Sequence, residues 1–270
     1  MKKVAILGTG PAGLAAAHAA GVMGHMVQIF TQGGDDGPTK SRIGGAQFLH
    51  IPLPVINDPE PDAMLTYLTA GTTDGYREKV YGPDGDVPFV SMERIPKGGA
   101  VPAWSLIDTY DKLWDVYCSG TSVNVISLDP KRLIDIIERG NFDLVVSTIP
   151  KPALCLAHAG LVPEIHAFVS QRIRIANECV LPSPDNQIFY NGTPDVSWYR
   201  TSTIFGVGST EWGAGAPERL PYRDLVSVKK PIRSDCTCFD GKVLFTGRFG
   251  LWRKGVLSHE GFIDTMEALK

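Results

Sequence analysis

The sequence predicts an α/β fold, in which a parallel sheet with packed helices carries a smaller inserted α+β domain. Three segments that lie far apart in the chain predict this arrangement. Residues 4–31 read as strand, helix and strand. Residues 143–150 (DLVVSTIP) and 243–246 (VLFT) are short apolar runs, which are typical of buried parallel strands.

The first segment carries a glycine motif at a place where it can bind phosphate. Val4–Leu7 is an apolar strand, Leu14–Met23 is an Ala-rich helix and Val27–Phe30 is a second strand. Between the first strand and the helix lies the pattern G-x-G-x-x-G, formed by Gly8, Thr9, Gly10, Pro11, Ala12 and Gly13. Its glycines allow a tight turn, close approach of a pyrophosphate and close helix packing, while the helix N-terminus offers free N–H groups. The segment predicts a Rossmann-like dinucleotide-binding domain.

The residues after the second strand bear on which dinucleotide is bound. An acidic side chain usually holds the adenine ribose about 20 residues after the motif. Here Thr31 and Gln32 occupy that position. Their neutral side chains can still bond a ribose hydroxyl, but more weakly. Lys40 and Arg42 follow closely enough to keep NADP as an alternative.

The C-terminal segment favours a flavin. The strand Val243–Thr246 leads into a Gly-rich turn and then into a helix-like tail, Ser258–Leu269. The turn consists of Gly247, Arg248, Phe249 and Gly250. With GTGPAG near the N-terminus and DLVVSTIP between them, this pattern resembles the superfamily of amine oxidases, protoporphyrinogen oxidase and UDP-galactopyranose mutase. The resemblance implies FAD as the cofactor, with the turn against the flavin and the last helix aimed at the isoalloxazine.

The resemblance also implies a discontinuous FAD-binding domain. We expect it to comprise residues 1–57, 118–157 and 239–270, and the substrate domain to comprise residues 58–117 and 158–238. In the substrate domain, the spacing of Leu106, Tyr110, Leu113 and Tyr117 predicts a helix. Residues 168–176 and 199–207 each read as one strand.

The composition bears on membrane insertion, on the redox state of the cysteines and on metal binding. No apolar run reaches 18 residues, so we expect no membrane span. The odd count of five cysteines, without a secretion signal, predicts reduced thiols in a cytoplasm. Cys236-x-Cys238 is too short for the usual zinc pair and no second pair answers it, so we expect no metal.

The charge distribution is uneven. The formal net charge is −3, yet residues 219–254 carry nine basic and three acidic side chains. This basic segment fits either the surroundings of a flavin pyrophosphate with a solvated surface, or a site for an anionic substrate.

Two histidines are candidates for the chemistry. In residues 41–50 (SRIGGAQFLH), glycines permit close backbone approach, and Gly45, Ala46 and Gln47 would contact the flavin. His50 ends this segment and His259 begins the last predicted helix. Either ring could act at the flavin or be an ordinary polar, capping or core residue.

Aromatic and basic side chains predict the substrate site. Trp198 and Tyr199 offer flat surfaces for stacking, and Arg200 offers a fork for a carboxylate or phosphate. Trp252 and Lys254 are further candidates. The alternative is a strand whose arginine is merely exposed.

The motifs GAQFLH, PDVSWYRTS, KKPI and GRFGLWRKGVLSH also resemble a small branch of flavoproteins that are often encoded by bacterial viruses. That branch is linked to hypermodification of thymine in viral DNA. The resemblance implies oxidation and cleavage of a C–N bond, on an amine or on an amino acid attached to thymine, with modified DNA as a partner. The alternatives are a mutase-like enzyme on a sugar nucleotide and a flavin-binding regulatory module.

Overall fold

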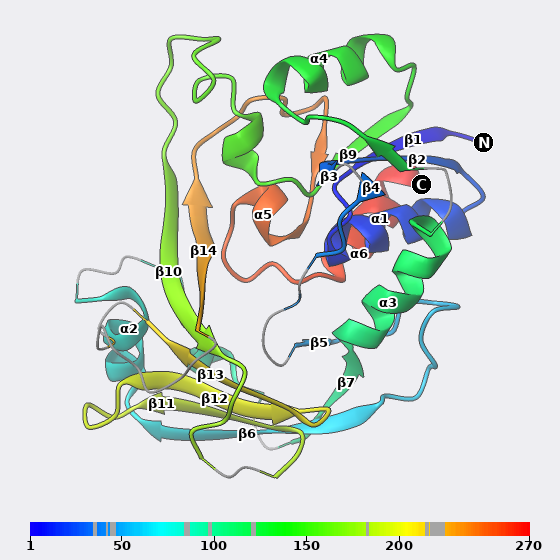
Figure 1. The fold of residues 1–270 in the computed structure, drawn as a ribbon. Helices are drawn as coiled ribbons and strands as arrows, with labels where there is room; N and C mark the ends of the chain where they lie inside the picture. Colours follow the sequence, from blue (N-terminus) through cyan, green and yellow to red (C-terminus); the bar gives the residue numbers. More distant parts are fainter. Residues whose placement is uncertain are drawn as a thin grey trace.

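Two sheets and the helices packed on them form the protein in a computed structural model (Figure 1). It describes residues 1–34, 37–41, 43, 47–83, 87–96, 99–119, 123–181, 184–213, 216 and 225–270. Within these ranges the strands form a five-stranded sheet, an eight-stranded sheet and a two-stranded ribbon of β3 (Gly33–Gly34) and β4 (Gly37–Pro38).

The five-stranded sheet is parallel throughout, in the order β15-β9-β1-β2-β8. Its strands are β1 (Lys3–Leu7), β2 (Met26–Thr31), β8 (Val123–Val125), β9 (Leu144–Ser147) and β15 (Leu244–Phe245). The α/β fold class and the strands predicted from the first, middle and last motifs are confirmed.

Helices cover both faces of this sheet (Figure 1). They are α1 (Pro11–Val22), α3 (Leu106–Tyr117), α4 (Pro130–Arg139) and α6 (Glu260–Leu269). Successive side chains of β1 point to opposite faces of the sheet. Val4 and Ile6 pack with α1, α3 and α6 on one face, while Ala5 and Leu7 pack with α4 on the other. Across the described ranges, no helix has the length and apolar character that crossing a membrane requires.

The helix α3 packs against α1, although the sequence assigns residues 106–117 to the substrate domain. Its apolar face joins the core of the parallel-sheet layer through Leu106, Tyr110 and Leu113. By its contacts this helix belongs with the nucleotide-binding layer. The domain limits themselves stay a prediction.

The eight-stranded sheet lies beside the first layer, in the order β14-β10-β13-β12-β11-β6-β7-β5. Its strands are β5 (Phe48–Leu49), β6 (Ala63–Gly71), β7 (Val101–Ser105), β10 (Phe168–Ala176), β11 (Gln187–Gly192), β12 (Trp198–Ile204), β13 (Val207–Trp212) and β14 (Val226–Ser234). The helix α2 (Thr73–Tyr81) packs on one face through Tyr76 and Val80. The long strands β10 and β14 run side by side from this sheet up toward α5 (Gly247–Leu251) (Figure 1).

Two local predictions are wrong. Residues 199–207 form two strands, because Phe205 and Gly206 have φ of 51° and 72° and make a two-residue hairpin turn between Ile204 and Val207. The segment 247–250 is the start of the short helix α5, which begins at Gly247 with φ of 70°. In both places a glycine, Gly206 or Gly247, takes a left-handed conformation. The chain continues as the strand β13 after Gly206 and as the helix α5 from Gly247.

Candidate functional site

All five parallel strands end at one edge of the first sheet, where the predicted cofactor residues gather. Backbone hydrogen bonds tie these ends together: the Gly8 N–H donates to Phe30 O at 2.8 Å, and the Thr148 N–H donates to Leu7 O at 3.0 Å. The Thr246 N–H donates to Ser147 O at 3.1 Å. Ligands of open α/β sheets bind outside this edge.

The three motif glycines have different surroundings. A Cβ added at Gly13 would lie 2.0 Å from Gly8 O, so only glycine lets α1 pack this close to the first strand. Gly8 has φ of 103°, which favours glycine at the tight turn. A Cβ at Gly10 would meet nothing nearer than Ser41 Oγ at 3.9 Å. Gly10 is therefore open toward a ligand, at the N-terminus of a helix that has no side-chain cap among the described residues.

The C-terminal motif contacts the N-terminal one. A Cβ at Gly247 would lie 2.8 Å from Ala12 Cβ, and a Cβ at Gly261 would lie 2.2 Å from Ala12 O. A Cβ at Gly250 would lie 2.5 Å from Ser147 O. The starts of α5 and α6 are thus packed directly on the glycine motif. Phe249 beside them is 42% exposed.

Thr31 and Gln32 stand at the end of β2, where an acidic residue usually binds the adenine ribose, and their surroundings differ. Thr31 is buried, and its Oγ1 lies 2.9 Å from Thr9 Oγ1 and donates to Gln32 O at 3.1 Å. Gln32 is exposed, with its Nε2 at 3.5 Å from Leu128 O. Gln32 is therefore better placed than Thr31 to reach a ribose. Lys40 pairs with Asp111 at 2.5 Å.

Part of the predicted 41–50 segment lies outside the described residues, namely Arg42, Gly44, Gly45 and Ala46. Gln47 is described and exposed. Tyr110 braces the beginning of this segment: its hydroxyl accepts from the Ser41 N–H at 2.9 Å and donates to Thr9 O at 2.8 Å. The segment therefore starts against the glycine motif.

The two candidate histidines meet. His50 follows β5, at the edge of the second sheet, and His259 is the N-cap of α6. Their ring centroids lie 5.8 Å apart. Burial, with a smaller contribution from His50, lowers the pKa of His259 to about 4, and desolvation also lowers the pKa of His50. Both rings are neutral near pH 7, and the buried Nδ1 of His259 has no hydrogen-bond partner among the described residues.

A bulge in the second sheet places Tyr199 and Arg200 on one carboxylate. The register between β12 and β13 shifts between Trp198 and Arg200, so Tyr199 is the extra residue opposite Glu211. Arg200 Nη2 lies 2.6 Å from Glu211 Oε1, while the Tyr199 hydroxyl donates to Glu211 Oε2. Burial favours the protonated form of Glu211, but Arg200 and Lys230 outweigh it and lower its pKa to about 2.

Three more cations join Arg200, and we call Arg200, Lys230, Arg248 and Lys254 the cationic cluster. Lys230 Nζ lies 2.7 Å from Glu211 Oε2, and burial lowers the pKa of Lys230 to about 8 despite that contact. Burial, together with the charges of Arg77 and Arg248, lowers the pKa of Lys254 to about 7. Burial and Arg200 also lower the pKa of Arg248, against the attraction of Glu211. The cluster is a partly buried excess of positive charge, which suits an anion.

Tyrosines rather than tryptophans line the cluster. Tyr76, Tyr81 and Tyr190 have raised pKa values, because they are buried, and their pKa values also respond to charged members of the cluster and to Glu211. Trp198 and Trp252 are 8% and 7% exposed, and the Trp252 Nε1–H donates to Val169 O at 3.1 Å. These two indoles are packed in the protein rather than presented for stacking.

Sequence reasoning missed Glu211 and the tyrosines Tyr76, Tyr81 and Tyr190, and it singled out Lys230 only as one of nine basic residues in segment 219–254. Glu211 stands in a strand of hydroxyl and apolar residues (VGSTEW), where a charged residue signals a partner. The partner of Glu211 can be named as Arg200 only once residues 198–212 are known to form a hairpin. Tyr76, Tyr81 and Tyr190 come from α2 and β11, which no local pattern links to Arg200.

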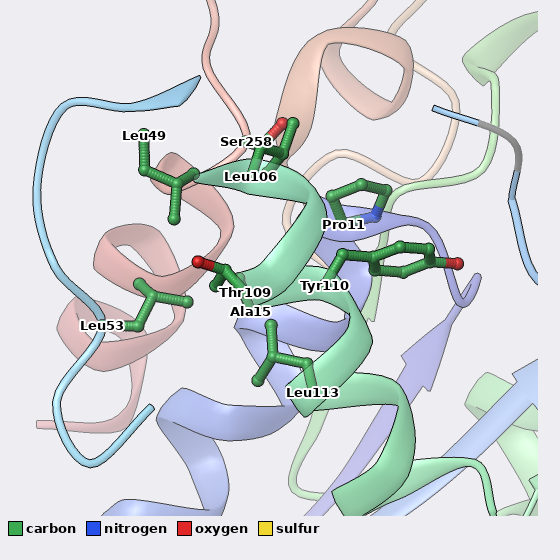
Figure 2. Close-up of a pocket in the computed structure, with 9 residues that line it drawn as sticks. All are labelled: Pro11, Ala15, Leu49, Leu53, Leu106, Thr109, Tyr110, Leu113 and Ser258. Atoms are coloured by element: carbon green, nitrogen blue, oxygen red, sulfur yellow. The ribbon is translucent and has the colours of Figure 1, made fainter. Parts of the chain in front are cut away.

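A separate small cavity lies between α1, α3 and residues 49–53 (Figure 2). Its volume is about 10 Å³, close to that of a single water molecule. Apolar side chains such as Leu49, Leu53 and Leu113 line it. It is a packing defect rather than a ligand site.

Comparison with known proteins supports the fold. No protein-family model matches the sequence, and no curated protein matches it significantly. The crystal structure of reduced UDP-galactopyranose mutase matches with a TM-score of 0.60 and 12% identity, over 100% of this chain and 93% of its own. That of p-nitrophenol 4-monooxygenase PnpA from Pseudomonas putida DLL-E4 matches with a TM-score of 0.51 and 12% identity, over 100% of this chain and 80% of its own. At such identity the similarity establishes the fold.

Proposed function

We propose that this protein is an FAD-dependent enzyme that acts on an anionic substrate. One observation carries the proposal: the short helix α5 belongs to both sites. Gly247 at its start lies against Ala12 of the glycine motif, and the next residue, Arg248, is part of the cationic cluster. A cofactor bound at the motif and an anion bound at the cluster would therefore meet at α5.

The residues present fit FAD. Gly10 leaves the backbone open where a pyrophosphate would approach, and the uncapped N-terminus of α1 offers N–H groups to it. Gln32 would hold the ribose in place of the usual acid, while the turns at Gly247 and Gly250 would form the second contact. When bound, FAD supplies the hydride acceptor of the reaction. The shared fold with UDP-galactopyranose mutase, one member of the superfamily that the sequence resembles, supports this cofactor.

For the reaction we propose oxidation of a C–N bond next to a carboxylate. The substrate carbon loses a hydride, the amine loses a proton, and the resulting imine takes up water and splits into an amine and a carbonyl product. On a glycine-type adduct, the products are the free amine and glyoxylate. His259 or His50, neutral near pH 7, would take the proton or position the water. Arg248 and Lys254 would hold the carboxylate beside Arg200, which is already paired with Glu211.

A second candidate is a mutase-like reaction on a sugar nucleotide, without net oxidation. The cationic cluster favours it, because four neighbouring cations with only one carboxylate, Glu211, among them can neutralise a diphosphate better than they match one carboxylate. The same side chains would bind in both cases.

Anaerobic mixing distinguishes these candidates. We expect the purified protein to contain FAD, and an N-substituted glycine to bleach the flavin absorbance without added reductant. If a sugar nucleotide reacts, and only after chemical reduction of the flavin, the mutase is correct. Arg248→Ala should abolish either response and keep the flavin, whereas Arg253→Ala, at an exposed neighbour, should preserve both. A folded protein that neither contains nor binds FAD would contradict the proposal.

A further inference from the structure

Four potential metal ligands meet outside the flavin and anion sites. Cys155, His166, Cys236 and Cys238 each offer one ligand atom, and these atoms all lie within 4.8 Å of one another. His166 Nδ1 lies 3.2 Å from Cys155 Sγ and 3.7 Å from Cys238 Sγ. The expectation that Cys236-x-Cys238 has no partners is therefore wrong, since the fold supplies both partners from another part of the chain.

The four residues lie where the chain passes between the two sheets. Cys155 ends the 3-10 helix Lys151–Leu154, and His166 precedes β10. Cys236 and Cys238 lie on the return path, between β14 and β15. The outgoing and returning segments are held in register by Asp235, whose Oδ1 accepts from the Ala167 N–H at 2.7 Å.

We propose that these four side chains bind one zinc ion as a structural Cys₃His site. Tetrahedral zinc with thiolate and imidazole ligands needs ligand atoms about 3.5–3.8 Å apart. The two distances from His166 Nδ1 lie close to that spacing, so only small side-chain movements are required. Four protein ligands fill the coordination shell, which is the pattern of structural rather than catalytic zinc.

Two alternatives, a catalytic cysteine–histidine pair and an iron–sulfur cluster, fit the four residues less well. Cys155 is 1% exposed, which leaves no access for a substrate to a Cys155–His166 nucleophile pair. Ligand atoms this close together suit one ion rather than an iron–sulfur cluster.

Zinc would link the segment that precedes β10 to the segment that follows β14. Cys155 belongs to the nucleotide-binding layer, since the preceding Leu154 packs with the strands and α4 in its core. His166, Cys236 and Cys238 belong to the two segments that connect this layer with β10 and β14. Of these two paired strands, β14 carries Lys230 to the cationic cluster. The ion would thus fix the position of the second sheet relative to the first without touching the substrate.

The test measures zinc directly, so its result is independent of FAD and of activity. The full-length protein, purified without chelator and dialysed, should contain about one zinc per chain by elemental mass spectrometry. Cys236→Ser and His166→Ala should lose most of it. Matched controls are Cys179→Ser and His158→Ala, which change the same residue types outside the cluster and should keep the zinc. Equal zinc in all five proteins, iron in place of zinc, or metal-free wild type would overturn the proposal.

A second measurement uses the wild-type protein alone, so it stays decisive if the variants do not fold. In the native wild-type protein, Cys238, the partly exposed cysteine of the cluster, should resist alkylation until a chelator is added, and peptide mass spectrometry should then find it labelled. Cys155 and Cys236 are buried, so their labelling in the folded protein does not report on the metal. Cys179, which is partly exposed, is the internal reference and should react the same with and without chelator. A disulfide among the three cysteines, or labelling that ignores the chelator, would contradict a zinc site. Cobalt added to the chelated protein should give the visible absorption of tetrahedral thiolate coordination.

Discussion

Arg200 and Glu211 form an ion pair of 2.6 Å across neighbouring strands, and the pair exists because Tyr199 is an extra residue in β12. Without that bulge, successive side chains would point to opposite faces of the sheet. With it, Tyr199 and Arg200 both reach the Glu211 carboxylate, whose second oxygen also takes Lys230 at 2.7 Å. Glu211 therefore orients the cations of the site and leaves Arg248 and Lys254 for the ligand.

Glu211→Gln should destabilise the protein at neutral pH. The change leaves Arg200 and Lys230 without their carboxylate, at a cost on the order of 2–3 kcal/mol, since both cations are partly exposed. The folded-state pKa of Glu211 is lowered from 4.5 to about 2, so its stabilisation is present above pH 4.5 and is lost as the pH falls toward 2. Urea unfolding of both proteins across this range should show the difference between them shrinking with acid. A constant difference would mean that Glu211 is not charged in the native state.

Binding of an anion should weaken as the pH rises through 7 to 8. Lys254 and Lys230 bind anions only when protonated, and burial lowers their pKa values to about 7 and about 8. Titration calorimetry with inorganic pyrophosphate at low salt measures the effect. Lys254→Arg keeps the charge at every pH used, so it should flatten the lower part of this pH profile. A profile that is the same in both proteins would remove Lys254 from the anion site.

The nucleotide-binding half of the site could be predicted from sequence, and the substrate half only in part. The motif from Gly8 to Gly13 is local, because its strand, turn and helix follow one another in the chain. The resemblance implied only that the turn at Gly247 lies against a flavin, and its packing on Ala12 could not be predicted from any local pattern. The cationic cluster draws on β12, β14, α5 and the segment after α5, and its ion pair with Glu211 of β13 depends on a bulge that no residue type specifies. The Cys₃His group escaped detection for the same reason: its members are brought together by strand pairing between β10 and β14.

Substitutions at Gly10 and Gly13 should separate cofactor binding from folding. Gly10→Val has room for its Cβ, so the protein should fold, but the branched side chain would block the approach of a pyrophosphate and yield colourless protein. Gly13→Ala would place its Cβ 2.0 Å from Gly8 O and should impair folding itself. Circular dichroism reports the fold and flavin absorbance reports the cofactor. Full flavin content in folded Gly10→Val would rule out this position for the pyrophosphate.

The last prediction concerns what carries the substrate. If the amine is attached to a base in DNA, the affinity contains a phosphate contribution that counterion release makes sensitive to salt. The exposed Lys229 and Arg253 of the basic segment are available for such contacts. Neutralising about 3–5 phosphates would lower the affinity by roughly one and a half to three decades between about 50 and 200 mM salt. A duplex must also release the base before a flavin can reach its substituent, so modified single strands should react faster than modified duplexes. Product formation should be compared on a modified oligonucleotide, the matching nucleoside and a free N-substituted glycine, with Lys229→Gln and Arg253→Gln lowering only the first. Equal efficiency on all three substrates would exclude DNA as the carrier, and the enzyme would then be a small-molecule amine oxidase.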